Sequence, residues 1–286
     1  MRILTVDVED WFHILDNDAT QTEADWARFP SRLEQGVGRL LDLFDRRDQK
    51  ATCFILGWVA RNYPDVAAEI HRRGHEIATH SDMHQLVYDQ SPEAFEADLI
   101  ASLDAIEAAT GVRPTAYRAP GFSLVQSTAW AFDILARNGI RTDCSVFPAP
   151  RAHGGIPGFP EAGPCLLETP SGAELRAFPI NLGRFGPKRF VFSGGGYFRL
   201  APGTLLRRWF RKSDYVMTYF HPRDFDPDQP VVPGLSRARR FKSYVGLGGA
   251  LQKLDTLLQE HRFMTLADAE AQVDWRAAPL VRTATP

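Results

Sequence analysis

Residues 76–84 read Glu76-Ile77-Ala78-Thr79-His80-Ser81-Asp82-Met83-His84. The apolar run before His80 is typical of the end of a buried strand. One helical turn would bring His80 and His84, at positions i and i+4, to the same side, where neutral imidazole nitrogens can share a metal ion. The same spacing also describes two surface histidines in a polar turn, and a chain with 8 histidines can contain such a pair by chance. The rest of the chain has to decide between these interpretations.

The composition is that of a globular protein with a sizeable core. Of 286 residues, 44% are hydrophobic and 24% are charged. The net charge of -2 argues against a nucleic-acid-binding protein. No apolar run is long enough to span a bilayer, and the first residues are typical of a strand and not of a signal peptide. Cys53, Cys144 and Cys165 form no CxxC pair, and an odd number of cysteines fits a reducing compartment. We therefore expect a cytoplasmic location.

Strands and helices alternate in the first half of the chain, which predicts parallel βαβ units. The expected strands cover residues 3–6, 51–56, 76–79, 115–117 and 140–142. The expected helices start at Ser31 with Glu34 placed for a capping box, at Pro64, after Ser91 and at Ser127.

The alternation of strands and helices becomes irregular after Asp143. Residues 148–170 are rich in Pro and Gly and are expected to be mostly loop. Short strands are expected at 178–180, 215–220 and 263–266, and a late helix covers residues 247–258.

Polar residues that could act together follow four of these expected strands. They are Asp7 with Glu9 and Asp10, His80 with His84, Arg118, and His221. In barrels of parallel strands the C-terminal strand ends form the active face, so these residues would converge in one cleft. A metal held by two histidines and one carboxylate, with a position open for water, matches a hydrolytic site. The other carboxylate could be a general base and His221 a general acid.

Each of these residues also has a simpler interpretation. Asp7 could cap a turn, although three acids beside an apolar strand repel each other unless a cation lies there. Arg118 could form a surface ion pair, and His221 could be an ordinary loop histidine.

In this order, the motifs resemble those of the NodB-type polysaccharide deacetylases. Residues 5–10 resemble the family's first motif, in which one acid is the base and a second binds metal, and residues 80–84 resemble its two-histidine metal motif. Arg118-Ala119-Pro120-Gly121 resembles the third motif, whose arginine contacts the catalytic acid, and residues 219–222 resemble the last, which carries the acid histidine. Residues 7–13, 194–200 and 221–226 and a C-terminal extension resemble the subfamily found with exosortase (PEP-CTERM) exopolysaccharide loci.

The resemblance implies an α/β fold, a distorted (β/α) barrel within one catalytic domain (1–286), elaborated from about residue 150 onward. It implies removal of N-acetyl groups from a polysaccharide amino sugar, with a divalent metal, zinc above all, as cofactor. Its roles are Asp7 as base, His221 as acid and Arg118 as the partner of Asp7. His80 and His84 would bind the metal together with Glu9 or Asp10.

Four further residues are expected to contact the substrate. Pro120 and Gly121 are expected at the substrate, and Trp11 and Tyr197 could stack on sugar rings. Asp143 resembles a family aspartate near the acid histidine, and whether it acts stays open.

Two other functions stay open on the sequence. One is an amidohydrolase acting on a small cyclic amide, as in an allantoinase-like branch that lacks a functional metal site. The other is a non-catalytic carbohydrate-binding barrel, in which the acids and His221 would be superfluous. The absence of GxSxG disfavours a serine hydrolase. The sequence does not fix the polymer or whether the chain forms a homo-oligomer.

Overall fold

The computed structural model describes residues 1–160, 163–185 and 188–283. Its strands are β1 (Arg2–Ile3), β2 (Thr5–Val8), β3 (Thr52–Ile55), β4 (Glu76–Thr79), β5 (Ala116–Tyr117), β6 (Thr142–Asp143), β7 (Cys165–Glu168), β8 (Glu174–Ala177), β9 (Gly183–Phe185), β10 (Lys188–Phe190), β11 (Val216–Met217) and β12 (Leu280–Arg282).

Its α-helices are α1 (Glu23–Trp26), α2 (Leu33–Arg46), α3 (Gly57–Asn62), α4 (Pro64–Arg72), α5 (Pro92–Thr110), α6 (Trp130–Arg137), α7 (Gly195–Leu200), α8 (Gly203–Lys212), α9 (Arg237–Tyr244), α10 (Leu247–Glu260) and α11 (Leu266–Gln272). Four short 3₁₀ helices join them in the described chain: η1 (Val87–Asp89), η2 (Pro120–Phe122), η3 (Gln126–Thr128) and η4 (Pro222–Phe225).

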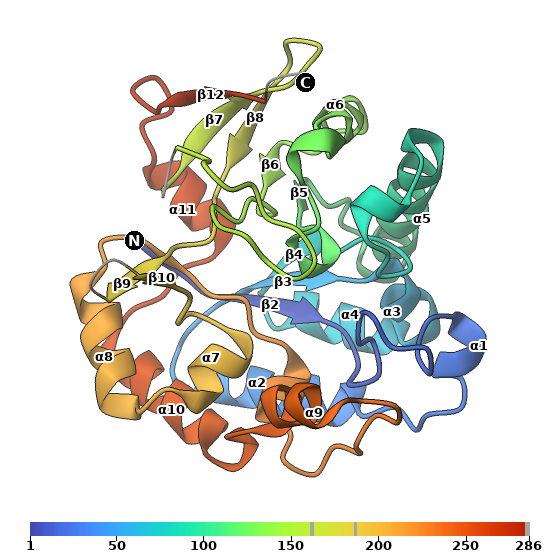
Figure 1. Ribbon diagram of the computed structural model, residues 1–286, viewed down its shortest axis with the longest axis vertical. Coiled ribbons are helices and arrows are strands. Elements are labelled where there is room, and N and C mark those ends of the chain that lie inside the picture. Colours follow the sequence, from blue (N-terminus) through green and yellow to red (C-terminus); the bar gives the residue numbers. More distant parts are fainter. Residues whose placement is uncertain (161–162, 186–187, 284–286) are drawn as a thin grey trace.

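The main sheet confirms the α/β class. Its eight strands have the order β12-β7-β8-β6-β5-β4-β3-β2. Strands β2 to β6 pair in parallel with their sequence neighbours, as the alternation of strands and helices predicts. Strand β7 runs antiparallel to β8, so the sheet is mixed. In Figure 1 the strands lie in the middle, with α3, α4 and α5 to the right and α7, α8 and α10 at the lower left.

The expected barrel is not closed by continuous strand pairing within the described residues. On the open side of β2, the N-terminal segment contacts the segment around β11 through a separate β1–β11 pair and through an isolated parallel bridge between Val6 and Phe220. A second isolated bridge joins Ile3 to Met264. The segment after β11 thus lies along the open edge of β2, and it carries His221 to the same end of the sheet as Asp7.

The amphipathic patterns and several caps form as predicted. Helix α5 starts after Ser91, whose side chain accepts a hydrogen bond from the Ala94 N–H, and Pro92 occupies its first turn. The proposed capping box of α2 is wrong, because the helix begins at Leu33 and Arg32 makes no side-chain cap. The Asp10 carboxylate caps the start of α2 instead. It accepts hydrogen bonds from the Arg32 N–H at 3.2 Å and from Ser31 Oγ at 2.5 Å.

The second half differs more from expectation. Residues 148–170 contain β7, and the strand expected at 178–180 lies slightly earlier as β8. Of the expected strand 263–266, Met264 forms an isolated bridge to Ile3, and Leu266 already begins α11. These short elements depend on partners distant in sequence, so periodicity alone does not reveal them. The three cysteines are buried, and Cys53 and Cys144 are free thiols. No helix in the described ranges combines the length and apolarity that crossing a bilayer requires.

Candidate active site

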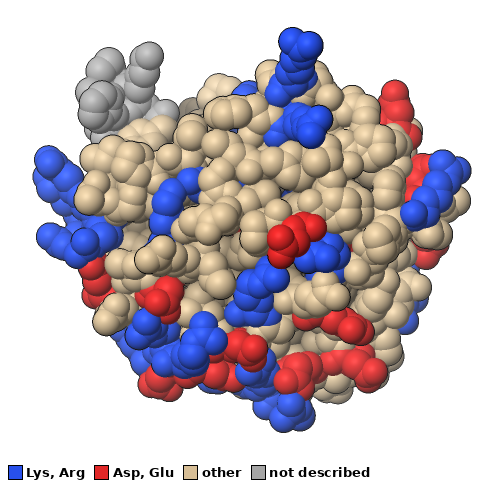
Figure 2. Space-filling view, turned by 90° about the horizontal axis from the view of Figure 1, so that it is seen from below, with Lys and Arg blue, Asp and Glu red and all other residues tan. Residues whose placement is uncertain are grey.

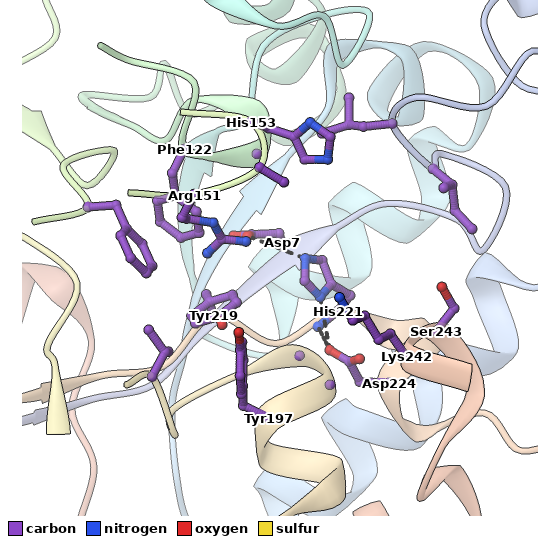
Figure 3. Close-up of a pocket in the computed structure, with 18 of the residues that line it drawn as sticks. Asp7, Phe122, Arg151, His153, Tyr197, Tyr219, His221, Asp224, Lys242 and Ser243 are labelled. Atoms are coloured by element: carbon purple, nitrogen blue, oxygen red, sulfur yellow. Dashed lines mark hydrogen bonds and ion pairs between the residues drawn. The ribbon is translucent and has the colours of Figure 1, made fainter. Parts of the chain in front are cut away.

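A cleft of about 890 Å³ opens where the C-terminal ends of the parallel strands meet. Asp7 reaches it from β2 and Glu9 from the residue after β2. His80 and His84 reach it from the loop after β4, and His221 from the segment after β11. This convergence is the one predicted from the strand ends. Figure 3 shows His221 and Asp7 facing each other in the cleft.

The loop that carries the two histidines is not a helical turn. Ser81 and His84 both have left-handed backbone conformations, with φ of 73° and 53°, which are uncommon for residues other than glycine. The loop is held by the Asp98 carboxylate of α5, which accepts from the N–H groups of Asp82 at 2.8 Å and Met83 at 3.0 Å. The histidines therefore converge because a carboxylate from a neighbouring helix fixes an unusual turn.

Glu9, His80 and His84 form a cluster that fits a metal ion. One ligand atom from each lies within 4.8 Å of the others, and all three residues are buried. His84 Nε2 is 2.7 Å from Glu9 Oε2, yet this oxygen has no hydrogen-bond partner among the described residues. The unpartnered oxygen of Glu9 and the neutral imidazole nitrogen of His84 are thus placed to bind one metal ion together.

The protonation states of these residues agree with such a site. His80 Nδ1 lies 2.8 Å from the Arg118 carbonyl oxygen, so Nδ1–H donates there and Nε2 keeps its lone pair. Burial lowers the pKa of His80 to about 4, which leaves it neutral. In the metal-free protein burial alone would raise the pKa of Glu9, but its interactions with His84 and His221 outweigh burial and hold that pKa well below its usual value, so Glu9 is an anionic ligand.

Of the two acids left open by the sequence, the structure places only Glu9 with the histidines. Asp10 points to the start of α2, where Trp11 N–H also donates to it at 2.8 Å. Glu9 directly follows β2, and its N–H donates to the Asp7 carbonyl oxygen at 3.1 Å, so the chain turns where the strand ends.

Asp7 is held by a buried arginine. Arg118 Nη1 donates to Asp7 Oδ1 at 2.6 Å and to Thr5 Oγ1 at 2.8 Å, and the Arg118 guanidinium lies 4.1 Å from the centre of the Phe54 ring. The Arg118 side chain is completely buried. One carboxylate oxygen of Asp7 is therefore fixed, and Oδ2 is left facing His221, whose Nε2 is 3.8 Å away.

His221 is oriented by a residue that the sequence reasoning missed. Its Nδ1 lies 2.9 Å from Asp224 Oδ2, and Arg199 Nε lies 3.0 Å from the other oxygen of Asp224. Burial lowers the pKa of His221, but Glu9 and Asp224 together outweigh it and raise that pKa to about 9. The only sequence signal for Asp224 is its spacing of three residues from His221, which matches a capping box on η4.

Asp143 lies outside this set. It is buried, accepts from the Ser145 N–H at 2.9 Å, and does not line the cleft. Burial raises its pKa to about 6.

The four expected substrate residues take different places. Gly121 and Tyr197 line the cleft, and Tyr197 is 60% exposed, which leaves its ring free to meet a sugar. The Trp11 ring is buried against Phe12 and Phe29 and its Nε1 donates to the Pro30 carbonyl oxygen. Neither Trp11 nor Pro120 lines the cleft.

Comparisons with known proteins divide the chain near residue 143. Residues 25–142 match the polysaccharide deacetylase family, and residues 144–271 match a family described as a domain of unknown function, DUF3473. Chitin deacetylase 2 of Cryptococcus neoformans var. grubii is 33% identical over 111 residues, 35% of this chain and 24% of that protein. The peptidoglycan deacetylase of Helicobacter pylori is 29% identical over 113 residues, 40% of this chain and 38% of that protein. The chain thus matches well under half the length of either relative.

Solved structures share the fold. A putative polysaccharide deacetylase from Mycobacterium smegmatis matches with a TM-score of 0.66 at 20% identity, over 100% of this chain and 93% of that one. A CE4 family pseudoenzyme from Bacillus anthracis matches with a TM-score of 0.52 at 15% identity, over 94% and 64%. The fold alone therefore does not separate catalysts from inactive relatives. Residues 25–142 therefore resemble the polysaccharide deacetylase family, and the chain as a whole shares its fold with these solved structures.

Proposed function

We propose that this protein is a metal-dependent hydrolase that removes N-acetyl groups from the amino sugars of a polysaccharide. The observation that carries the proposal is the convergence of Glu9, His80 and His84 beside Asp7 and His221 in one cleft. The match of residues 25–142 to the polysaccharide deacetylase family supports it independently.

Glu9, His80 and His84 would hold the metal. Two neutral imidazoles and one carboxylate form a donor set that zinc binds well and that leaves a position open. A divalent ion there would polarise the acetyl carbonyl and lower the pKa of bound water. Zinc is our proposed ion because nitrogen and oxygen donors are combined at the site.

Asp7 is the proposed base. The attacking water forms a bond to the acetyl carbonyl carbon and gives a proton to Asp7 Oδ2. The other oxygen of Asp7 is fixed by Arg118 at 2.6 Å, which keeps the free oxygen in one orientation.

His221 is the proposed acid. The carbon–nitrogen bond breaks as the His221 Nε2 proton passes to the leaving amine, so acetate and a free amino sugar result. Asp224 keeps Nδ1 protonated and orients the ring. With its pKa at about 9, His221 carries the required proton at neutral pH.

The chain is proposed to work as one catalytic domain. The metal-binding histidines lie in residues 25–142, whereas His221 lies in the segment that matches DUF3473. The site therefore needs both segments. The exosortase-associated subfamily and a role in exopolysaccharide biosynthesis stay predictions.

The proposal is tested by measuring acetate release from N-acetylated oligosaccharides. The metal-free protein, the zinc-loaded protein and the His84→Ala variant are compared. His71→Ala, which removes an exposed histidine of α4, is the matched control. We expect release only from the zinc-loaded wild type and the control. Release that persists without metal contradicts the proposed mechanism, and turnover of a small cyclic amide in place of the oligosaccharides favours the amidohydrolase alternative.

A further inference from the structure

The cleft contains more positive charge than its acidic residues neutralise. Each described acidic lining residue has a nearby basic group: Asp7 pairs with Arg118, which does not itself line the cleft, and Asp224 pairs with Arg199. Asp16 lies 3.1 Å from His153, and Glu9 lies 2.7 Å from His84. Arg151, Arg223 and Lys242 line the same cleft. None of these three forms an ion pair with a carboxylate in the described part of the chain, so they are available to a ligand.

Arg151 is held in place by aromatic rings. Its guanidinium carbon lies 4.6 Å from the centre of the Phe147 ring, 5.0 Å from that of Phe122 and 5.7 Å from that of Tyr219. The Tyr219 ring centre is in turn 6.3 Å from that of His221. Arg151 and the proposed acid thus share a neighbour, and Figure 3 shows Arg151 beside Tyr219 with His221 across the cleft.

The loop that presents Arg151 has a backbone that requires glycine. The Arg151 N–H donates to the Gly154 carbonyl at 3.0 Å, and Gly154 and Gly155 have φ of 146° and 90°. A Cβ at Gly154 would lie 2.2 Å from the Phe122 carbonyl oxygen, and one at Gly155 would lie 2.1 Å from that of Ala149. This tight turn fixes the start of the Arg151 side chain over the aromatic rings.

Arg223 adds a buried donor. Its Nη2 is buried and has no hydrogen-bond partner among the described residues. The guanidinium carbon lies 5.7 Å from the centre of the Tyr244 ring. A buried N–H group without an acceptor is costly, and a carboxylate that accepts a hydrogen bond from it removes that cost.

We propose that the substrate is an acidic polysaccharide, in which sugars that carry carboxylates lie next to the N-acetylated amino sugar and bind Arg151 and Arg223. This inference rests on the proposed deacetylase function and adds the substrate class. The planar guanidinium groups match the two oxygens of a carboxylate, and Lys242, which is exposed and lines the same cleft, adds a third positive charge. Tyr197, exposed at the same cleft, offers a face for the neutral part of a sugar.

The positive charge is local to the cleft. The whole chain has a net charge of -2, and Figure 2 shows Lys and Arg interspersed with Asp and Glu across the face that it displays. A general attraction for polyanions such as nucleic acids would require a continuous basic surface. Recognition of an acidic glycan at one site requires only a few placed cations.

The experiment uses hyaluronan oligosaccharides, which alternate N-acetylglucosamine with glucuronate, and the same oligosaccharides after reduction of their carboxyl groups. The wild type should show a KM at least about tenfold lower for the carboxylated form, the effect expected for a charge-assisted contact. Arg151→Gln and Arg223→Gln should each remove most of this preference and leave kcat on the reduced form unchanged. Arg208→Gln, an exposed arginine of α8 outside the cleft, is the matched control.

Equal KM values of the wild type for the two forms, or an equal loss in the variants on both forms, would overturn the inference. Equilibrium binding of both oligosaccharides to the Asp7→Asn variant tests recognition without turnover. If this variant prefers the carboxylated form and wild type releases no acetate, the substrate class stands and the proposed activity fails. The last measurement is the binding of a sulfated oligosaccharide of the same length whose carboxyl groups have been reduced. Binding of that oligosaccharide as tight as that of the carboxylated form overturns the assignment to carboxylates.

Discussion

Two adjacent acids, Glu9 and Asp10, should have separable roles, although the sequence offers both as metal ligands. Glu9 Oε2 faces His84 Nε2 at 2.7 Å, whereas Asp10 accepts hydrogen bonds at the start of α2. We therefore expect Glu9→Gln to abolish metal binding and Asp10→Ala to reduce stability alone.

The structure gives rough magnitudes for both variants. Loss of an N-terminal helix cap costs about 1–2 kcal/mol, which corresponds to a fall in Tm of roughly 2–8 °C for a chain of this size. Loss of an outer partner of a metal ligand costs about 10–100-fold in affinity, so loss of Glu9, a direct ligand, should cost more. Zinc at about a hundred times its Kd stabilises the folded state by about 2.7 kcal/mol, or roughly 5–11 °C.

The assay is thermal unfolding of the metal-free protein with and without zinc, together with metal analysis after dialysis. Wild type and Asp10→Ala should both gain Tm on adding zinc, the latter from a lower starting value. Glu9→Gln should show no gain. The reasoning is refuted if Asp10→Ala loses the zinc-dependent gain while Glu9→Gln retains it.

Three further predictions follow from the same contacts. Asp7→Asn should bind zinc normally and lose roughly 10²- to 10⁴-fold in kcat, because it removes the base and no ligand; loss of metal together with activity would make Asp7 a ligand. Asp98→Ala should weaken zinc binding about 10–100-fold, because the His80–His84 loop loses the acceptor for two N–H groups; zinc titration with unchanged affinity would contradict this. The pKa of His221 is raised from 6.5 to about 9, so in the metal-free protein its contribution to stability is fully present below pH 6.5 and is lost as the pH rises through 9. The unfolding free energy should therefore fall over this range by up to about 1.4 kcal/mol per pH unit more than in His221→Gln, and chemical denaturation curves with the same pH slope for both proteins would argue against the raised pKa.

The sequence predicts the first half of the sheet well because its signals are local. Strand β4 forms over the expected residues 76–79, and Ser91 and Pro92 start α5 as predicted. These features depend on neighbours within one turn or one strand. The polar residues at the strand ends therefore meet, as the alternation of strands and helices implies.

The sequence fails where a distant partner sets the local conformation. The turn from His80 to His84 takes its shape from Asp98 on α5, so spacing alone wrongly suggests a helical turn. The start of α2 is capped by Asp10, which lies far upstream in the chain. Asp224 contacts both Arg199 and His221, and its spacing of three residues from His221 is its only mark in the sequence, because Arg199 lies on a different element.

The two residues that we propose for proton transfer, Asp7 and His221, are aligned by main-chain hydrogen bonds. Asp7 N–H donates to the Phe220 carbonyl at 2.7 Å, and Phe220 N–H donates to the Thr5 carbonyl at 3.2 Å. Asp7, the proposed base, and His221, the proposed acid, are thus fixed relative to each other by two adjacent backbone segments. Because His80 and His84 come from another strand, metal binding and proton delivery depend on different contacts. A substitution that displaces the segment before His221 should therefore lower kcat while the affinity for metal is retained.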